Sequence, residues 1–296
     1  MEGITDVLSN GLKSIKNNTV LFVPTIILIS ISIIGSLVLG FSPLFLGSLE
    51  NIWIITLVSL CFAVFVFLIG IFATAGQIGM AKEVASTGKT AWNHFMSYGK
   101  RFFGRVFAAN IILMLIQSVA LIFWIPTFYV IYNSGLINDG FIDDYAIVSL
   151  LSLAILPIMI GLILTIIYLI IVYVLFFFVN YNIVVDNISA IDSFKKSISL
   201  LKAKTSQVLL FIVVLYIVSM LIGSIMYVLS IPMIVLIFYG MVADSIAFTV
   251  IGYALYVILM IILSIIIEIL TVVWVTRFYM AITEKTLYVK EKLTNY

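Results

Sequence analysis

Glu268 is the strongest candidate for chemistry in this chain, because it is an ionisable side chain inside a long apolar run. No other Asp, Glu, Lys or Arg occurs between positions 246 and 276. A carboxylate at the bilayer centre costs about 2.5–3.5 kcal/mol, and such residues often mark proton or cation pathways. Twenty residues counted from Ile246 end at Ile265, which predicts that Glu268 lies near the inner membrane boundary. Two interpretations stay open: a hydrogen bond to a neighbouring helix, and proton or cation coupling.

Two further polar residues are intramembrane candidates, Asn110 and Gln117, and Thr165 is a third polar side chain within an apolar run. Polar side chains in membrane helices commonly hydrogen-bond across to a neighbouring helix. The other interpretation is that they line a pathway through the bundle.

No familiar catalytic, metal or cofactor motif accompanies these residues. His94 is the single histidine and Cys61 the single cysteine, so neither a zinc site nor a disulfide framework can be built from them. The segment Gly88-Lys89-Thr90 resembles the end of a phosphate-binding loop, but Glu83 stands where that loop requires glycine. We therefore expect no catalytic, cofactor-binding or metal-binding residues, no enzyme activity and no nucleic-acid partner.

The elements that position these residues are membrane helices. Hydrophobic residues make up 64% of the 296 positions, charged residues 9%, and the mean hydropathy is +1.32. A soluble domain, at about 25% charged residues, is far more polar, so the surplus apolar surface must face lipid. The chain is predicted to be all-α, a polytopic bundle of about six spans in a single integral membrane domain (1–296), with spans near 19–40, 52–80, 106–132, 146–180, 206–238 and 245–280.

The basic residues fix the predicted orientation. All fifteen Lys and Arg fall before the first apolar run, between the second and third, between the fourth and fifth, or after the sixth. The other three connections (41–51, 133–145 and 240–245) carry acids and no base. Because basic loops stay in the cytoplasm, we expect a multi-pass protein of the cell membrane with both termini cytoplasmic.

The even-numbered spans are longer than a bilayer requires. A helix of 35 residues reaches about 52 Å, against a hydrocarbon core of about 30 Å. They must tilt, kink or continue into the cytoplasm. Pro126, Pro157 and Pro232 lie within apolar runs and are the candidate kinks.

A short amphipathic stretch precedes each odd-numbered span. Ser189 and Asp192 have the spacing of a capping box, and Thr90 opens a similar stretch 99 residues earlier. Such stretches are typical of helices in the headgroup layer near anionic lipid, or of helices packed on the ends of the long spans. We therefore predict three repeats of an interfacial helix plus a helical hairpin, at about 4–84, 89–187 and 188–285, followed by a cytoplasmic tail at 286–296.

The segment Ile183-Val-Val-Asp-Asn-Ile-Ser-Ala-Ile-Asp-Ser-Phe194, with the Lys-Lys-Ser-Ile-Ser-Leu-Leu that follows, resembles a known pattern. It is similar to a group of uncharacterised six-span prokaryotic membrane proteins, related to the membrane domain attached to some glycerophosphodiester phosphodiesterases. The resemblance implies six spans. The hydrolase domain of those enzymes is absent from this sequence, so their activity is not implied.

Two functions agree with these observations. The first is a non-enzymatic module that interacts with lipid, including anionic headgroups, or holds protein partners, and the basic amphipathic stretches favour it. The second is a transporter or channel for a small solute, favoured by the repeats, the prolines and Glu268. The substrate, protein partners and oligomeric state are not indicated by the sequence.

Overall fold

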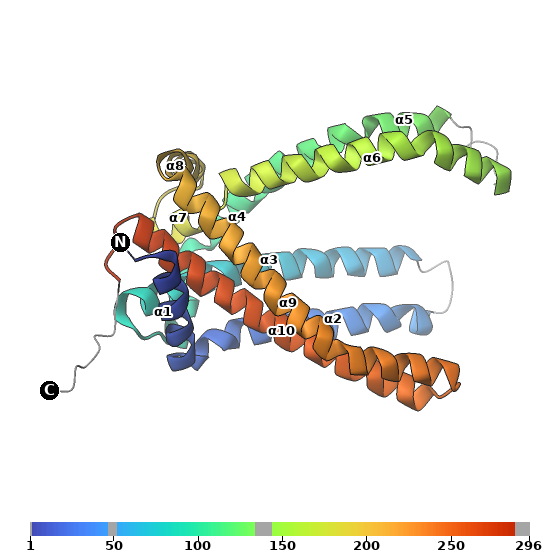
Figure 1. Cartoon of the computed structure of the whole chain (residues 1–296), viewed down its shortest axis with the longest axis horizontal. Coiled ribbons are helices and arrows are strands. Elements are labelled where there is room, and N and C mark those ends of the chain that lie inside the picture. The colour runs from blue at the N-terminus through green and yellow to red at the C-terminus, as the bar shows by residue number, and fades with distance from the viewer. Residues whose placement is uncertain (1, 47–51, 134–143, 288–296) are drawn as a thin grey trace.

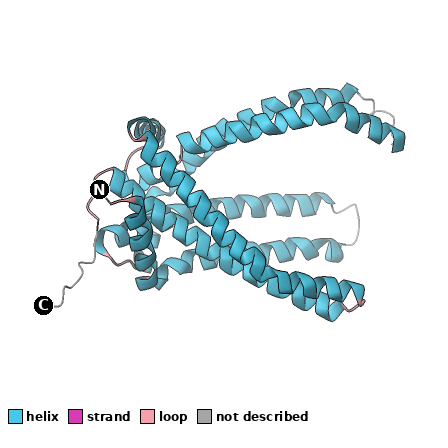
Figure 2. Ribbon diagram, in the orientation of Figure 1, coloured by secondary structure: helices cyan, strands magenta, loops and turns pink. Residues whose placement is uncertain are grey.

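The computed structural model of the chain describes residues 2–46, 52–133 and 144–287 (Figure 1). These residues are helical, with short loops and no strand among them (Figure 2), which confirms the all-α prediction. The elements are α1 (Ile4–Asn17), η1 (Thr19–Leu21), α2 (Phe22–Leu46), α3 (Ile52–Thr87), α4 (Trp92–Ser118), η3 (Val119–Trp124), α5 (Ile125–Asn133), α6 (Asp144–Leu175), α7 (Val179–Asp186), α8 (Ala190–Ala203), α9 (Thr205–Val242) and α10 (Ile246–Ile282).

Three helical hairpins extend from one compact end of the molecule. Figure 1 shows three pairs: α2 with α3, α4–η3–α5 with α6, and α9 with α10. All three run away from the end of the molecule that holds α1, α8 and the last turns of α10. Six helical stretches in the described residues are long and apolar enough to cross a membrane. The prediction of a polytopic bundle with about six spans is therefore confirmed.

The packed core lies entirely at the compact end, which we call the basic end. Every Lys and Arg among the described residues lies in the segments that build it, at positions 13, 16, 82, 89, 100, 101, 105, 195, 196, 202, 204, 277 and 285. The predicted loop at 133–145 and the tail at 286–296 fall largely outside the described residues, as does 47–51 of the predicted loop at 41–51, whereas 41–46 belongs to α2. The buried apolar residues come from α1, the starts of α4 and α9, the ends of α3 and α10, and α7.

Away from the basic end, the hairpins expose their apolar side chains. On α6, Ile163, Leu164, Ile166 and Ile167 are all exposed, although these neighbouring positions point to different sides of the helix. A soluble protein cannot expose such a surface, whereas lipid solvates it as well as another apolar helix does. Within the described residues, the exposed apolar faces of the hairpins are therefore surfaces that lipid can cover.

The excess length of the even-numbered spans is used to build the core. Helix α3 has 36 residues and α10 has 37, so each is about 54 Å long at 1.5 Å per residue. In α10 the residues from Ile269 to Ile282 are mostly buried, and the rest of the helix is largely exposed. The last third of the helix is thus a packing element rather than a span.

One of the three candidate prolines coincides with a change of helix type. The six residues before Ile125 and Pro126 form the 3-10 segment η3, where α4 gives way to α5. Helices α6 and α9 continue through Pro157 and Pro232. A further break, between α6 and α7, needs no proline, because the Ser197 hydroxyl on α8 donates to the carbonyl of Leu175 (2.8 Å) at the end of α6.

The interfacial stretches form helices in all three places, but not in the same way. Helices α1 and α8 are separate from the spans that follow, whereas the second stretch continues into its span as the single helix α4. Asn18 and Lys204 leave helical geometry, with φ of −134° and −133°. Nothing comparable interrupts α4. The capping of α8 is confirmed, since Ser189 Oγ accepts from the amide of Asp192 (3.2 Å).

Candidate functional site: two polar clusters

Glu268 lies in a polar cluster that joins three helices. The side-chain amide of Gln77 on α3 donates to Glu268 Oε1 on α10 (2.9 Å) and to Thr25 Oγ1 on α2 (2.8 Å). Gln77 and Thr25 are buried, and Glu268 is half-buried. We call these three residues the Glu268 cluster. The hydrogen bond to a neighbouring helix that the sequence predicted is therefore present, with Gln77 as the partner that sequence reasoning did not name.

A small cleft borders the Glu268 cluster. Its walls come from η1, α3 and α10, and they are apolar apart from Gln77: Leu21, Gln77, Met80, Ile269, Val272 and Val273. On both long helices the lining positions lie at or beyond the cluster in the direction of the basic end. The cleft therefore lies between Glu268 and the outer surface of the basic end.

The other two predicted candidates are not part of this cluster. Asn110 donates to the carbonyl of Val106 (2.8 Å), one turn earlier in its own helix, and Gln117 is exposed on the surface of α4. No hydrogen bond among the described residues joins either side chain to Glu268. Thr165 does contact a neighbour, since Trp124 Nε1 donates to its hydroxyl (3.1 Å) between the two helices of the middle hairpin.

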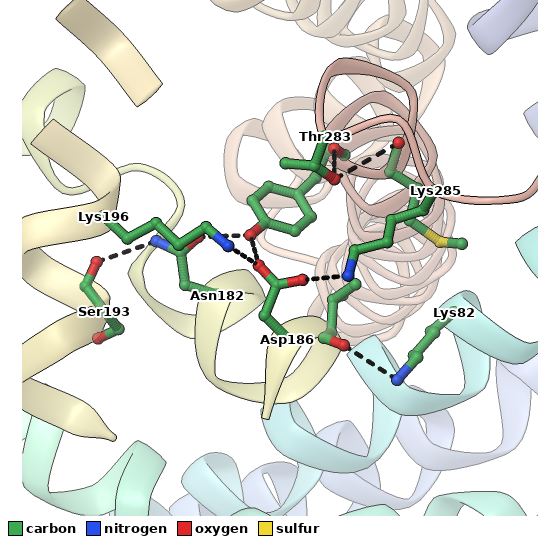
Figure 3. A network of polar contacts seen from close by, with 10 residues as sticks. Lys82, Asn182, Asp186, Ser193, Lys196, Thr283 and Lys285 are labelled. Atoms are coloured by element: carbon green, nitrogen blue, oxygen red, sulfur yellow. Dashed lines mark hydrogen bonds and ion pairs between the residues drawn. The ribbon is translucent and has the colours of Figure 1, made fainter. Parts of the chain in front are cut away.

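The second cluster surrounds Asp186 at the end of α7 (Figure 3). The Asp186 carboxylate is buried and lies 2.5 Å from the ammonium of Lys196 on α8 and 2.9 Å from that of Lys285 after α10. The hydroxyl of Tyr279 on α10 is hydrogen-bonded to this carboxylate and to Asn182 Oδ1 (2.6 Å). We call these five residues the Asp186 cluster.

Lysines next to the Asp186 cluster compensate the ends of helices. Lys82 Nζ donates to the carbonyl of Val185 (3.1 Å) at the end of α7, and Lys204 Nζ donates to that of Ile282 (2.6 Å) at the end of α10. The C-terminus of a helix carries about half a negative charge and several carbonyls without an intrahelical donor. The basic residues here therefore have a packing role, because they neutralise helix ends that meet in one place.

A buried ion pair attaches α1 to α10. Arg277 is 2% exposed, and its guanidinium donates to both oxygens of Glu2, from Nε (2.8 Å) and Nη2 (2.5 Å). Three residues earlier, Trp274 Nε1 donates to the carbonyl of Leu8 (3.0 Å), and its ring lies against Gly11. A Cβ at position 11 would lie 2.5 Å from that ring, so glycine is required there.

The remaining candidate groups of the sequence do not come together in one site among the described residues. Within the described ranges no three His, Cys, Asp or Glu side chains gather as a metal site would require. His94 Nδ1 lies 3.3 Å from the Thr90 hydroxyl, and Cys61 is exposed. The pairing of Asp186 with Lys196 and Lys285 is a tertiary contact that the sequence spacing does not predict.

Comparison with known proteins gives one family. No curated protein and no solved structure matches the chain, and no link to the membrane domain of the glycerophosphodiester phosphodiesterases emerges. The matching family model is described as a domain of unknown function, DUF7847, and it covers residues 3–282. That range contains the six candidate membrane helices of the described residues, the Glu268 cluster and four of the five residues of the Asp186 cluster, all but Lys285. The chain is a multi-pass membrane protein that belongs to the DUF7847 family.

Proposed function

We propose that this protein is a non-enzymatic membrane module that organises lipid at the cytoplasmic face of the cell membrane, with both termini in the cytoplasm. The observation that carries the proposal is the division of α1, α8 and the first half of α4 into three faces: one packed on the core, one apolar and partly exposed, and one basic. The same helices would serve for holding a protein partner, and the lipid function is the one their surface chemistry favours.

Helix α8 presents these faces most clearly. Ser193 and Ser197 are buried against the core, so small polar residues rather than large apolar ones face the protein. At 100° per residue, half-buried Phe194 lies about 80° round the helix from the centre of this face, and Ile191, which is 63% exposed, lies about 140° round. The face beyond these carries two exposed lysines, Lys195 and Lys202.

Helix α1 repeats the order with different residues. Its packed face consists of Val7, Gly11 and Ile15. Leu12 lies next to that face and is 51% exposed, and beyond it are Lys13 and Lys16, both exposed. An exposed leucine beside lysines has the pattern of a helix at the headgroup boundary, where the apolar flank enters the acyl region and the ammonium groups reach the phosphates.

The first half of α4 follows the same rotational order. The buried positions are Phe95, Gly99 and Phe102; the half-buried flank contains Met96 and Phe103; and the exposed basic residue that follows is Lys100. Three helices with the same order of faces are what units related by rotation about the membrane normal require. This order supports the proposed threefold repeat at about 4–84, 89–187 and 188–285.

A test compares lipid selectivity in the intact protein. The full chain is reconstituted with spin-labelled phosphatidylglycerol or phosphatidylcholine, and the fraction of immobilised lipid is measured. We expect a preference for the anionic lipid that decreases by at least half when Lys13, Lys16, Lys195 and Lys202 are all changed to Gln. The control changes two exposed neutral residues of the same helices, Ser9→Gln and Ser199→Gln. Equal immobilisation of both lipids by the unchanged chain would refute the lipid function.

Transport of a small solute is the second candidate, and the Glu268 cluster is the observation that favours it. The Glu268 carboxylate, hydrogen-bonded to Gln77 near a membrane boundary, resembles a coupling site for a proton or cation. Against it, the exposed residues of the three hairpins, among those described, are predominantly apolar and form no shared polar face. Flux into proteoliposomes that disappears in Glu268→Gln would favour transport, and unchanged flux would exclude coupling by Glu268.

A further inference from the structure

The negative charge of Glu268 has no cation from the protein among the described residues. Its carboxylate receives a hydrogen bond from Gln77 at Oε1, and no Lys or Arg in the described ranges lies within ion-pair distance of it. This differs from Asp186, which has two lysines. A half-buried carboxylate without a counter-charge is costly, so a cation from outside the chain is the chemical complement of this site.

The acceptors that remain define what kind of cation fits. The Gln77 amide uses its nitrogen for Thr25 and Glu268, so its carbonyl oxygen is left to accept. Glu268 Oε2 is also left to accept, because neither it nor Gln77 Oε1 has a hydrogen-bond donor among the described residues. Two remaining acceptor oxygens and one negative charge match a group that carries both a positive charge and several N–H donors.

The neighbouring cleft indicates that this group is attached to a carbon chain. The cleft walls are apolar, with Gln77 as the polar exception. A free hydrated ion gains nothing from leucine, methionine and valine side chains, whereas the methylenes next to an ammonium group do. The cleft holds about 10 Å³ of space, roughly that of one water-sized group, so it suits an ammonium group and not a trimethylammonium group.

The depth of the cluster points to lipid as the source. Glu268 follows Ile246, the first residue of α10, by 22 residues, or about 33 Å along the helix, which is about the thickness of the hydrocarbon core. Thr25 is one turn from the start of α2 at Phe22. Both positions agree with the boundary between acyl chains and headgroups. The cleft opens on the headgroup side of that boundary.

We propose that the Glu268 cluster binds the primary ammonium group of an aminophospholipid headgroup. The Glu268 carboxylate pairs with the charge, Glu268 Oε2 and Gln77 Oε1 accept N–H bonds, and the methylene next to the ammonium group lies against the apolar side chains that border the cleft. A trimethylammonium group has the same charge but no N–H donor and more bulk, so the site discriminates against it. The inference relies on the proposed function for the placement of the basic end at the inner leaflet.

The test on the unchanged chain uses four lipids that differ by one methyl group each. Full-length protein in nanodiscs with phosphatidylethanolamine, its N-methyl and N,N-dimethyl forms, or phosphatidylcholine is released into the gas phase, and retained lipid is measured by native mass spectrometry. Because a hydrogen bond to a charged group contributes about 1.5–3 kcal/mol, we expect retention to fall about tenfold or more across the series. Equal retention of all four lipids would overturn the proposal.

Variants assign the effect to the site. Glu268→Gln removes the charge and should abolish the discrimination between the first and last lipid of the series. Glu284→Gln is the matched control, because Glu284 is exposed at the same end of the chain and lies 3.9 Å from Lys204. Discrimination that survives in Glu268→Gln overturns the assignment. If circular dichroism shows that either variant is misfolded, the methylation series on the unchanged chain still tests whether the protein selects a primary ammonium group.

Soluble competitors separate lipid from a free cation. Ethanolamine or sodium ions are added to protein in detergent, and thermal stability is recorded. We expect sodium to have no effect and ethanolamine to act only at high concentration, because it lacks the attached chains. Sodium that stabilises the chain through Glu268, with no dependence on lipid methylation, would make the site an ion site and overturn the lipid source. The anionic-lipid experiment is independent of these outcomes, since it changes lysines and uses two headgroups that carry no N–H donor.

Discussion

The basic end and the Glu268 cluster treat buried charge in opposite ways. At the basic end, Asp186 contacts Lys196 and Lys285, and Arg277 contacts Glu2 with two hydrogen bonds. The carboxylate of Glu268 contacts a neutral amide. Glu268 and Arg277 both belong to α10 and are nine residues apart. A buried charge therefore does not by itself mark a functional site. The question to ask first is whether another residue of the chain supplies the opposite charge.

The compensated charges explain why the core is placed at the end of the molecule. Hydrophobic burial gives no driving force between helices inside lipid, so a membrane protein needs other contacts to hold its hairpins together. Here the long helices extend past the hydrocarbon, and their ends are joined by ion pairs, helix-end lysines and stacked rings such as Phe211 on Phe278, with centroids 3.8 Å apart. The hairpins can then diverge without loss of the fold.

The largest effect should follow from removing one partner of the most buried ion pair. Glu2→Gln leaves the Arg277 guanidinium buried beside a neutral group, and breaking a buried pair in this way costs about 3–5 kcal/mol. The free energy of unfolding can be measured in mixed micelles by titration with a denaturing detergent. Lys195→Gln is the control, because its partner Asp192 is 4.0 Å away and both side chains are exposed, so its cost should stay below about 0.5 kcal/mol. A cost for Glu2→Gln no larger than that of the control would contradict the structural role.

A smaller loss is expected at the Asp186 cluster. Tyr279→Phe removes the hydroxyl that contacts Asn182 and Asp186, and it leaves the buried Asn182 Oδ1 without this donor. The expected cost is about 1–3 kcal/mol. Tyr216→Phe removes a hydroxyl from a side chain that is 67% exposed, and it should change stability by less than about 0.5 kcal/mol. Similar values for the two variants would show that the Asp186 cluster does not hold the hairpins together.

Membrane helices were predictable because they depend on properties that a single segment carries. The apolar runs that include Ile163 and Ile217 have the length and composition of spans wherever their neighbours lie. The capping of α8 by Ser189 was predictable for the same reason, since both partners are three residues apart. The choice of Glu268 as a candidate also followed from local context, because it is a single carboxylate in an apolar run.

Partners that come from distant segments could not be predicted. Gln77 is 191 positions from Glu268 and Glu2 is 275 positions from Arg277, and no residue spacing encodes such contacts. The break between α6 and α7 belongs to the same class, because the donor that fills it, Ser197, is on another helix. The sequence also did not predict that the second interfacial stretch and its span form the single helix α4. Whether two helical stretches join depends on whether a residue between them leaves helical geometry, and the sequence signals this only weakly.

Glu268→Gln should have little effect on stability, in contrast to Glu2→Gln. A glutamine at this position keeps a carbonyl that accepts from Gln77, and it removes a charge for which the described residues provide no counter-ion. In detergent without aminolipid, we expect the free energy of unfolding to change by less than about 1 kcal/mol, or to rise, because the desolvated charge is gone. A loss above about 2 kcal/mol would place Glu268 in the same class as the charges of the basic end, with a structural role.

The smallest effect is expected for a polar residue that contacts neither cluster. Gln117 is exposed, and it lies 11 residues, or about 16 Å, into the span that begins near Val106, so its amide faces the middle of the hydrocarbon. Gln117→Leu should therefore leave stability unchanged or raise it by less than about 1 kcal/mol. Leu115→Gln is the reverse change at a neighbouring position that is 65% exposed, and it should lower stability by a similar amount. If Gln117→Leu destabilises the chain in a lipid bilayer but not in detergent, then the Gln117 amide meets a hydrogen-bonding partner that the bilayer preserves, and the middle hairpin is a protein-binding surface.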